Sequence, residues 1–252
     1  MDLSGRHALV SGGGTGVGAA VATALVQSGA KVTICGRRSE PLDELASSHD
    51  NIHAVTCDVT DEGSVSACVD SAVAMSGPVD IAVANAGAAQ AKPFLKMTSG
   101  DLAKMLDVNL TGTFNLWRAT ASGMRENGWG RMIAIASIAG LKGHSYISAY
   151  CAAKHGVIGL TRALAHEFAT SGITVNAICP GYVETDLLDN AIDNIVAKTG
   201  MDREAAAETL KQGSPQNRFI QPSEVAHTVL WLCGDGACSV NGAAIPISGG
   251  EV

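Results

Sequence analysis

Runs of apolar residues recur along the chain, and most are apolar at consecutive positions rather than at alternate ones. Such runs are typical of strands that are buried on both faces of a sheet, because no position in them faces water. The predicted strands span residues 7–11, 31–35, 52–57, 79–85, 130–137, 173–179 and 242–248. Segments with helical spacing of apolar positions separate them, at residues 16–28, 40–48, 61–76, 100–127, 149–170 and 222–234.

This alternation of strand and helix predicts βαβ units, which place a parallel sheet between helices on both of its faces. We therefore predict an α/β, doubly wound fold with a mostly parallel, seven-stranded sheet, formed by residues 1–252 as a single domain. Only the segment 184–215 breaks the rhythm, because it has the pattern of two helices separated near Gly200. Since it follows the carboxyl end of a strand, it is predicted to be a helical lid over a ligand crevice.

Composition and charge exclude several classes of protein. The 252 residues are 46% hydrophobic and 16% charged, which indicates a globular chain rather than a disordered one. A net charge of -7 disfavours nucleic acid or a membrane as the main partner. We expect neither a signal peptide nor a membrane span. Seven cysteines without a C-x-x-C pair indicate reduced thiols in a cytoplasmic protein, with no metal site expected.

The first strand is followed directly by a glycine-rich turn, SGGGTGVG at residues 11–18, which opens the first helix. Gly12, Gly16 and Gly18 permit a tight turn, a close backbone approach to a pyrophosphate and tight packing of the helix on the sheet. The free N–H groups at the start of the helix would then face the anion. A simple tight turn is the alternative, but this position between strand and helix favours a dinucleotide site.

Charged residues after the second and third strands are candidates to bind the adenosine end of a dinucleotide. An acidic residue after the second strand would favour NAD, whereas this chain has Arg37 and Arg38 there. Guanidinium groups suit a 2′-phosphate, so we predict that NADP is preferred and that NAD is possible. The alternative is that two arginines begin a solvated loop. Asp58 could bind the adenine amino group or cap the next helix, although Asp61 is better placed for the cap.

Several polar residues are expected to meet at the carboxyl edge of the sheet. Asn85 and Ser137 end the fourth and fifth strands, and Asn109 lies within a predicted helix. Tyr150 and Lys154 are four residues apart, so both lie on one face of the next helix. A lysine cation near a phenol favours the phenolate, and we expect it to lower the pKa of the tyrosine. Each residue alone has an ordinary structural explanation, but all of them together favour a catalytic site.

Taken together, these motifs resemble those of the short-chain dehydrogenase/reductase family, in the family's shorter form. The matching motifs are Ser11-Gly12-x-x-x-Gly16-x-Gly18, Asn85-Ala86-Gly87, Asn109, Ser137, Tyr150-x-x-x-Lys154 and Pro180-Gly181. They occur in the family's order and span nearly the whole chain. The resemblance implies a Rossmann-type fold, an NAD(P)-dependent oxidoreductase that interconverts a secondary alcohol and a ketone, and a homotetramer or homodimer.

The resemblance also implies a role for each matching residue. Tyr150 would be the general acid in reduction and the general base in oxidation, and Ser137 would bind the substrate oxygen. Lys154 would also hold the nicotinamide ribose, Asn109 would support a water linked to Lys154, and Thr185 would bind the carboxamide. The implied dinucleotide-binding residues are Gly12, Thr15, Gly16, Val17, Gly18, Arg37, Arg38, Asp58, Val59, Asn85, Ala86, Gly87, Tyr150, Lys154, Pro180, Gly181, Val183 and Thr185.

The nearest branch of the family is that of the 3-hydroxybutyrate dehydrogenases and 3-oxoacyl reductases, and the chain departs from it at two positions. Ile147 and Ala139 stand where that branch has a lysine and a histidine that help to bind the substrate carboxylate. Free 3-hydroxybutyrate is therefore disfavoured, and a 3-oxoacyl thioester or another apolar ketone is predicted. The candidate substrate-binding residues are Ser137, Ile138, Ile147, Tyr150 and Tyr182.

Two other functions remain open at this stage. One is an NAD-dependent catabolic dehydrogenase of secondary alcohols or 3-hydroxyacyl compounds. The other is a non-catalytic sensor that binds a dinucleotide, against which the intact set of four catalytic-type residues argues. His144, in the loop before the helix of Tyr150, could line the pocket or could be an ordinary solvated histidine.

Overall fold

The computed structural model describes residues 1–252 and contains a single parallel sheet of seven strands. The strands are β1 (His7–Ser11), β2 (Lys31–Gly36), β3 (Ile52–Thr56), β4 (Ile81–Ala84), β5 (Gly130–Ile135), β6 (Ile173–Pro180) and β7 (Ala244–Ile247). Their order in the sheet is β3-β2-β1-β4-β5-β6-β7, and every neighbouring pair is parallel. The predicted doubly wound α/β fold is therefore confirmed. Strands β2 and β3 lie on one side of β1, and β4 to β7 lie on the other side. This class of fold forms its ligand crevice between β1 and β4, where the order of the strands changes direction.

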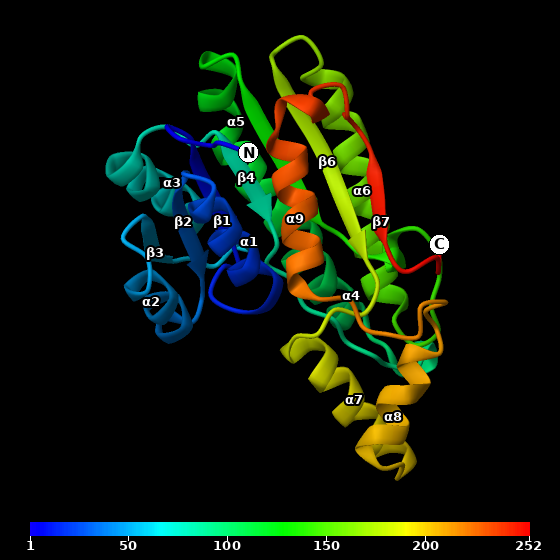
Figure 1. Ribbon diagram of the computed structural model, residues 1–252. Coiled ribbons are helices and arrows are strands. Elements are labelled where there is room, and N and C mark those ends of the chain that lie inside the picture. The colour runs from blue at the N-terminus through cyan, green and yellow to red at the C-terminus, as the bar shows by residue number, and fades with distance from the viewer.

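Six helices cover the two faces of the sheet (Figure 1). One face carries α1 (Gly16–Gln27), α2 (Ser39–Ser47) and α9 (Pro222–Cys233), and the other carries α3 (Glu62–Ser76), α5 (Gly112–Glu126) and α6 (Ser148–Glu167). Each face has its own hydrophobic core, because consecutive strand residues point to opposite sides. The strands are buried on both faces, which explains why their sequences are apolar at consecutive positions.

The predicted helix over residues 100–127 is present as an unbroken helical run over residues 99–126, but a π-helical turn lies inside it. The structure has α4 (Ser99–Leu106), a π-helical turn at Asp107–Thr111, and then α5. The amide of Asn109 donates from Nδ2 to the carbonyl oxygens of Met105 and Ala88, at 3.0 and 2.9 Å. In this π-helical turn the side chain of Asn109 points toward Ala88, in the loop that follows β4. Such π-turns interrupt helices at functional sites more often than elsewhere.

Two strands end earlier than predicted because side chains replace the sheet hydrogen bonds. The backbone N–H groups of Asn85 and Ala86 donate to the side-chain hydroxyl of Ser11 and not to a backbone carbonyl of a neighbouring strand, so β4 ends at Ala84. Ser137 likewise accepts from the N–H of Ala139 and begins a short 3-10 helix, Ile138–Gly140. Two further 3-10 turns span Phe94–Lys96 and Asp235–Ala237.

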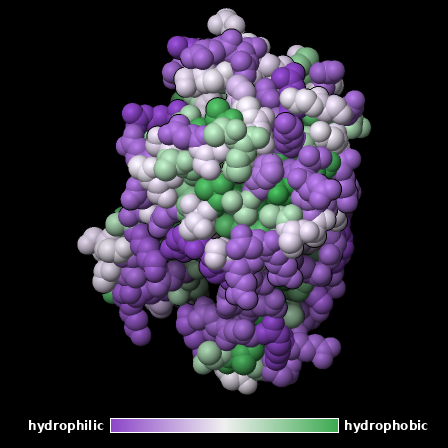
Figure 2. Space-filling model, turned by 90° about the vertical axis from the view of Figure 1, so that its left-hand side faces the viewer, coloured by the Kyte–Doolittle hydropathy of each residue, from purple (hydrophilic) through white to green (hydrophobic).

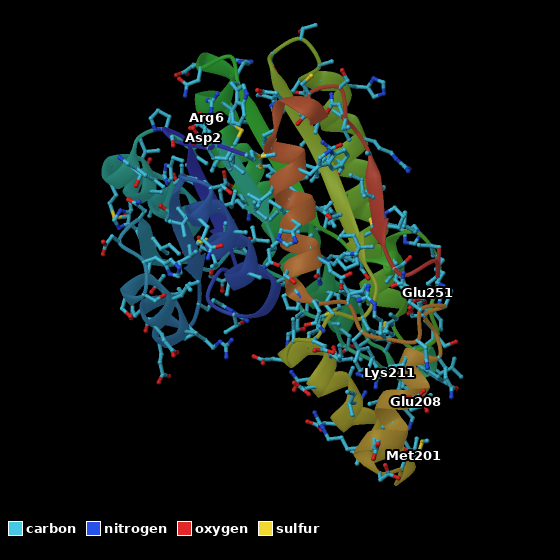
Figure 3. All side chains as sticks on the ribbon, viewed as in Figure 1. Asp2, Arg6, Met201, Glu208, Lys211 and Glu251 are labelled. Carbon is cyan, nitrogen blue, oxygen red and sulfur yellow. The ribbon has the colours of Figure 1, made fainter.

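The segment 184–215 forms two helices, α7 (Asp186–Thr199) and α8 (Arg203–Lys211), with Gly200 between them at a φ of 74°. Figure 1 shows the pair below the carboxyl ends of the strands. It packs around a small core of its own, which consists of Leu188, Ile192, Ala206 and Phe219. Met201, labelled in Figure 3, lies at the tip of the pair that is farthest from the sheet.

The outer surface is mostly hydrophilic. Figure 2 shows one face of the molecule on which a limited hydrophobic area is surrounded by hydrophilic residues. No helix of this chain combines the length and the apolar character that crossing a membrane requires.

Candidate active site

A cleft of about 1050 Å³ opens at the carboxyl edge of the sheet, where β1 and β4 lie side by side. Every site residue that the sequence predicted lines this cleft, with the exception of Gly18. The cleft is therefore long enough to bring together residues from the glycine-rich turn, the ends of the strands, α6 and α7. Gly14, Pro41 and Leu42 also line it and were missed, because no charged or catalytic-type side chain marks them in the sequence.

The glycine-rich turn forms one wall of the cleft. Gly12 and Gly16 have φ values of 62° and 54°, which are accessible to glycine at little cost. Thr15 precedes α1 but makes no side-chain cap, so the first N–H groups of this helix are not satisfied by a capping side chain. Gly18 lies behind the turn, and a Cβ atom on it would come within 2.1 Å of the carbonyl oxygen of Gly12. Gly18 thus acts through packing, while the turn itself presents N–H groups suited to an anion.

Hydrogen bonds fasten the glycine-rich turn to the end of β4. The hydroxyl of Ser11 accepts from the N–H groups of Asn85 and Ala86, both at 3.1 Å. In return, Nδ2 of Asn85 donates to the carbonyl oxygens of Ser11 and Gly12, both at 3.0 Å. These four hydrogen bonds hold the glycine-rich turn against the end of β4, where the cleft lies.

Arg37 and Arg38 lie exposed at the far end of the cleft, and neither forms an ion pair within the chain. Asp58 lies across from them and accepts from the N–H and hydroxyl groups of Thr60, at 3.0 and 2.8 Å. These hydrogen bonds, with a smaller effect of Arg37, lower the pKa of Asp58. Asp61, and not Asp58, caps α3, as the sequence predicted. This end of the cleft therefore offers two unpaired guanidinium groups.

At the opposite end, α6 presents Tyr150 and Lys154 beside Ser137. Nζ of Lys154 lies 5.6 Å from the centre of the Tyr150 ring and donates to the carbonyl oxygen of Ile135 at 2.8 Å. Tyr150 is 9% exposed and Lys154 is 5% exposed, although both side chains line the cleft. Asn109 forms two hydrogen bonds with the backbone of Ala88, and both Asn109 and Lys154 approach Gly87.

Burial determines the protonation of this pair. It raises the pKa of Tyr150 to about 12, and a hydrogen bond with Ser137 offsets only part of this rise. Burial also lowers the pKa of Lys154 to about 8. The pKa of Tyr150 is thus raised and not lowered, because the phenol is desolvated, while Nζ of Lys154 faces a carbonyl oxygen. The phenol keeps its proton at neutral pH and can act as an acid.

The shifted pKa of Lys154 makes the free energy of unfolding depend on pH. Its pKa is about 8 in the folded chain and 10.5 ordinarily, so between these values the unfolded state binds more protons and stability rises with pH. Relative to Lys154→Met, the wild-type chain should gain roughly 3 kcal/mol between these two pH values. Urea unfolding of both proteins across this range measures the gain. Parallel stability curves for the two proteins would contradict the shift.

The walls around Tyr150 combine apolar and polar side chains. Ile138, Ile147 and Tyr182 line the cleft there, as predicted. One face of α7 completes the wall, with residues Leu187, Asn190, Ala191, Asn194 and Ile195. Sequence reasoning did not name these positions, although their spacing of three and four residues marks one face of a helix.

The loop before α6 adds two unusual residues to this wall. His144 lines the cleft, and its Nε2 atom is buried without a hydrogen-bond partner. Burial lowers the pKa of this histidine. Tyr146 has a φ of 69°, a conformation that is uncommon for a bulky residue. Lys142 in the same loop pairs with Glu251 at 3.1 Å, so the C-terminal residues brace the loop; Figure 3 labels Glu251 beside the end of the chain.

Comparisons with known proteins agree with this geometry. Residues 6–196 match the short chain dehydrogenase family. An acetoacetyl-CoA reductase of Rhizobium meliloti is 39% identical over 98% of this chain and 98% of its own length. A 3-oxoacyl acyl-carrier-protein reductase of Rickettsia conorii is 34% identical over 99% of this chain and 98% of its own length.

Solved structures give the same result. An actinorhodin polyketide ketoreductase crystallised with NADPH has a TM-score of 0.95 and 35% identity, and the match covers 100% of this chain and 99% of that one. Levodione reductase has a TM-score of 0.93 and 33% identity, over 98% of each chain. The protein therefore belongs to the short-chain dehydrogenase/reductase family and is an NAD(P)-dependent oxidoreductase that acts on CH–OH groups.

Proposed function

We propose that this enzyme is a reductase that prefers NADPH and converts a 3-oxoacyl thioester, or a similar apolar ketone, to the secondary alcohol. The main support is that one continuous cleft has two unpaired arginines at one end and Tyr150, Ser137 and Lys154 at the other. The arginines match a 2′-phosphate. The buried, protonated phenol matches the acid that ketone reduction needs.

The residues of the cleft fit a dinucleotide. Added Cβ atoms at Gly12 and Gly16 would come within 2.9 Å of Asn85 and Thr185, so larger residues would displace side chains that line the cleft. Uncapped N–H groups of α1 would bind the phosphates, and Asp58 and Val59 would face the adenine. Pro180, Gly181, Val183 and Thr185 line the cleft where the nicotinamide end would lie. When bound, the dinucleotide supplies the hydride.

Tyr150 and Ser137 would act on the substrate oxygen. Ser137 would donate a hydrogen bond to the carbonyl and stabilise the negative charge that develops on its oxygen. Tyr150 would donate its phenolic proton to the same oxygen, which completes the alcohol. Because the pKa of Tyr150 is about 12, the phenol is protonated at neutral pH and can donate this proton.

Lys154 and Asn109 would support this proton transfer. The Lys154 cation would stabilise the tyrosinate that remains after the proton has left, and the bond to Ile135 fixes its position. Asn109 would act as a positioning residue, because it joins the π-turn to Ala88 in the adjacent loop.

The walls of the cleft favour a substrate without a free carboxylate. Around Tyr150 they include Ile138, Ile147 and Tyr182, and Lys154 is the only lysine or arginine at this end. A carboxylate would therefore be desolvated without a basic partner apart from His144, whose pKa is lowered by burial.

We also propose that α7 and α8 form a lid over this end, because residues of α7 line the cleft there. The preference for a substrate without a free carboxylate has its own test. Steady-state rates with a 3-oxoacyl-CoA and with the free 3-oxo acid test the preference, and a faster rate with the free acid would contradict it.

The arginine pair gives a direct test of the cofactor preference. In the double variant Arg37→Ala, Arg38→Ala, the affinity for NADPH should fall roughly 10- to 100-fold, because charged hydrogen bonds to the 2′-phosphate are lost. The affinity for NADH should change less than about threefold, since it has no phosphate there. Fluorescence titrations at one ionic strength measure both. Equal losses for the two dinucleotides, or tighter binding of NADH by the wild-type chain, would reject the preference and favour an NAD-linked dehydrogenase.

We also propose that the enzyme is a homotetramer or homodimer. A shallow apolar hollow on the outer faces of α5 and α6 is lined by Leu110, Thr111, Phe114, Gly159, Leu160 and Ala163. Phe114 is 44% exposed there, and a second copy of the chain would cover it. The mass in solution, from light scattering, tests this proposal.

A further inference from the structure

Three cysteine thiols meet inside the N-terminal half of the sheet. Cys35 lies near the end of β2, Cys57 follows β3 and Cys68 lies on α3. Their Sγ atoms all lie within 4.8 Å of one another, each residue is at most 2% exposed, and none forms a disulfide. No metal site was expected, because the seven cysteines include no C-x-x-C pair. We refer to them as the thiol triad.

The topology of the sheet explains how the thiol triad forms. Cys35 is the register partner of Val55 in the parallel pair of β2 and β3, so the side chain of Cys57 points to the same face of the sheet as that of Cys35. Helix α3 packs on this face and places Cys68 within the same core. All three positions are thus fixed by regular secondary structure, which makes the arrangement preorganised.

A disulfide between Cys35 and Cys57 fits this arrangement poorly. Cys57 is two residues beyond the partner of Cys35, which places their Cα atoms about 8 Å apart for standard strand spacings. Disulfides usually need Cα atoms about 4.4–6.8 Å apart, so this pair could not be joined without movement of the backbone. A metal ion at the centre of three sulfur atoms does not require them to touch, and sulfur separations of roughly 4 Å suit metal–sulfur bonds of about 2.3 Å.

We propose that the thiol triad binds one soft divalent metal ion of the d10 class through three thiolates. Each thiol gives up its proton, so one divalent cation and three thiols yield a complex of net charge -1 and three protons. Thiolate ligands select soft ions. Zn(II) prefers four ligands in structural sites and finds only three here, so a larger and softer ion such as Cd(II) should bind more tightly.

The position of Cys57 provides access to the thiol triad. Cys57 lines the cleft next to Asp58 and Val59, so an ion can reach the triad from the end where the adenine is proposed to bind. Its thiol donates to the carbonyl oxygen of Ser64 at 3.7 Å, in the first turn of α3, and this hydrogen bond is lost when the thiol gives up its proton to bind the ion.

Titration of the reduced protein with CdCl₂ tests this proposal. We expect one Cd(II) per chain, an ultraviolet thiolate-to-metal absorption, and about three protons released per ion in weakly buffered solution. Cys68→Ser should weaken the binding at least about 100-fold, because it leaves two thiolates. Cys68 does not line the cleft, so dinucleotide binding by this variant should stay at the wild-type level and verifies that it is folded. Cys238→Ser removes an exposed thiol outside the triad and should bind Cd(II) like the wild type.

Three results would overturn the proposal. The first is a folded Cys68→Ser variant that binds Cd(II) as tightly as the wild type. The second is Zn(II) binding that is equal to or tighter than Cd(II) binding, which would reject the preference for a softer ion. The third is a disulfide between two cysteines of the triad that forms on mild oxidation without metal. Mass spectrometry would show the loss of two thiols and identify the two residues.

Discussion

Replacing Tyr150 by Phe should lower the turnover of a 3-oxoacyl thioester by about 10³-fold, because the only proton donor of the proposed site is removed. The affinity for NADPH should change less than about threefold, since the ring stays in place and only the hydroxyl is lost. The phenyl ring should also be tolerated structurally, because Tyr150 is packed against Ala139 and Cys151. Single-turnover rates and fluorescence titration measure the two effects separately.

Tyr146→Phe is the matched control for this experiment. Tyr146 lines the same cleft, is 65% exposed and has no proposed role in proton transfer. It should retain turnover within about threefold of the wild type. If Tyr150→Phe also retained turnover within tenfold, the proton would come from another group and the proposed mechanism would be wrong.

Gly18→Ala should abolish measurable dinucleotide binding and destabilise the fold by about 3 kcal/mol. The added Cβ would lie 2.1 Å from the carbonyl oxygen of Gly12 and 2.6 Å from Nδ2 of Asn85. The first of these atoms belongs to the backbone, so the glycine-rich turn must move away from α1. Urea unfolding and NADPH titration measure the two losses.

Gly123→Ala on α5 provides the comparison for a helical glycine in open space. No atom lies within 4 Å of a Cβ at this position, so the substitution should stabilise the fold by about 0.5–1 kcal/mol. A Gly18→Ala protein with the stability and NADPH affinity of the wild type would show that the turn adapts freely, and would contradict the packing role of Gly18.

Much of the fold and the residues of the cleft could be predicted because they rest on local patterns. Apolar runs such as residues 31–35 identify buried strands, and the strand order follows from the connections between them. Asn85 and Ser137 follow the carboxyl ends of β4 and β5, and Tyr150 lies on the helix that comes after Ser137. All three therefore lie at the same edge of the sheet. Their roles in catalysis stay predictions until the experiments above are done.

Other features depend on contacts that no local pattern reveals. Asn109 lies in a π-turn of a helix that is regular in the sequence pattern, and its amide binds Ala88 in a loop 21 residues away. The pKa of Tyr150 is raised and not lowered, since burial outweighs the hydrogen bond with Ser137. The thiol triad forms only when β2, β3 and α3 pack together. In each case the deciding contact is tertiary.

The separate core of α7 and α8 has a consequence for the exchange of backbone amide hydrogens with solvent. Only four buried hydrophobic residues hold this pair, whereas each face of the sheet is held by a cluster of 23. Local opening of the pair therefore exposes far less apolar surface than global unfolding and needs a smaller free energy. Amides of residues 186–211 should exchange through this local opening while those of the sheet stay protected. The cleft can thus admit a bulky substrate many times within the lifetime of a single folded molecule.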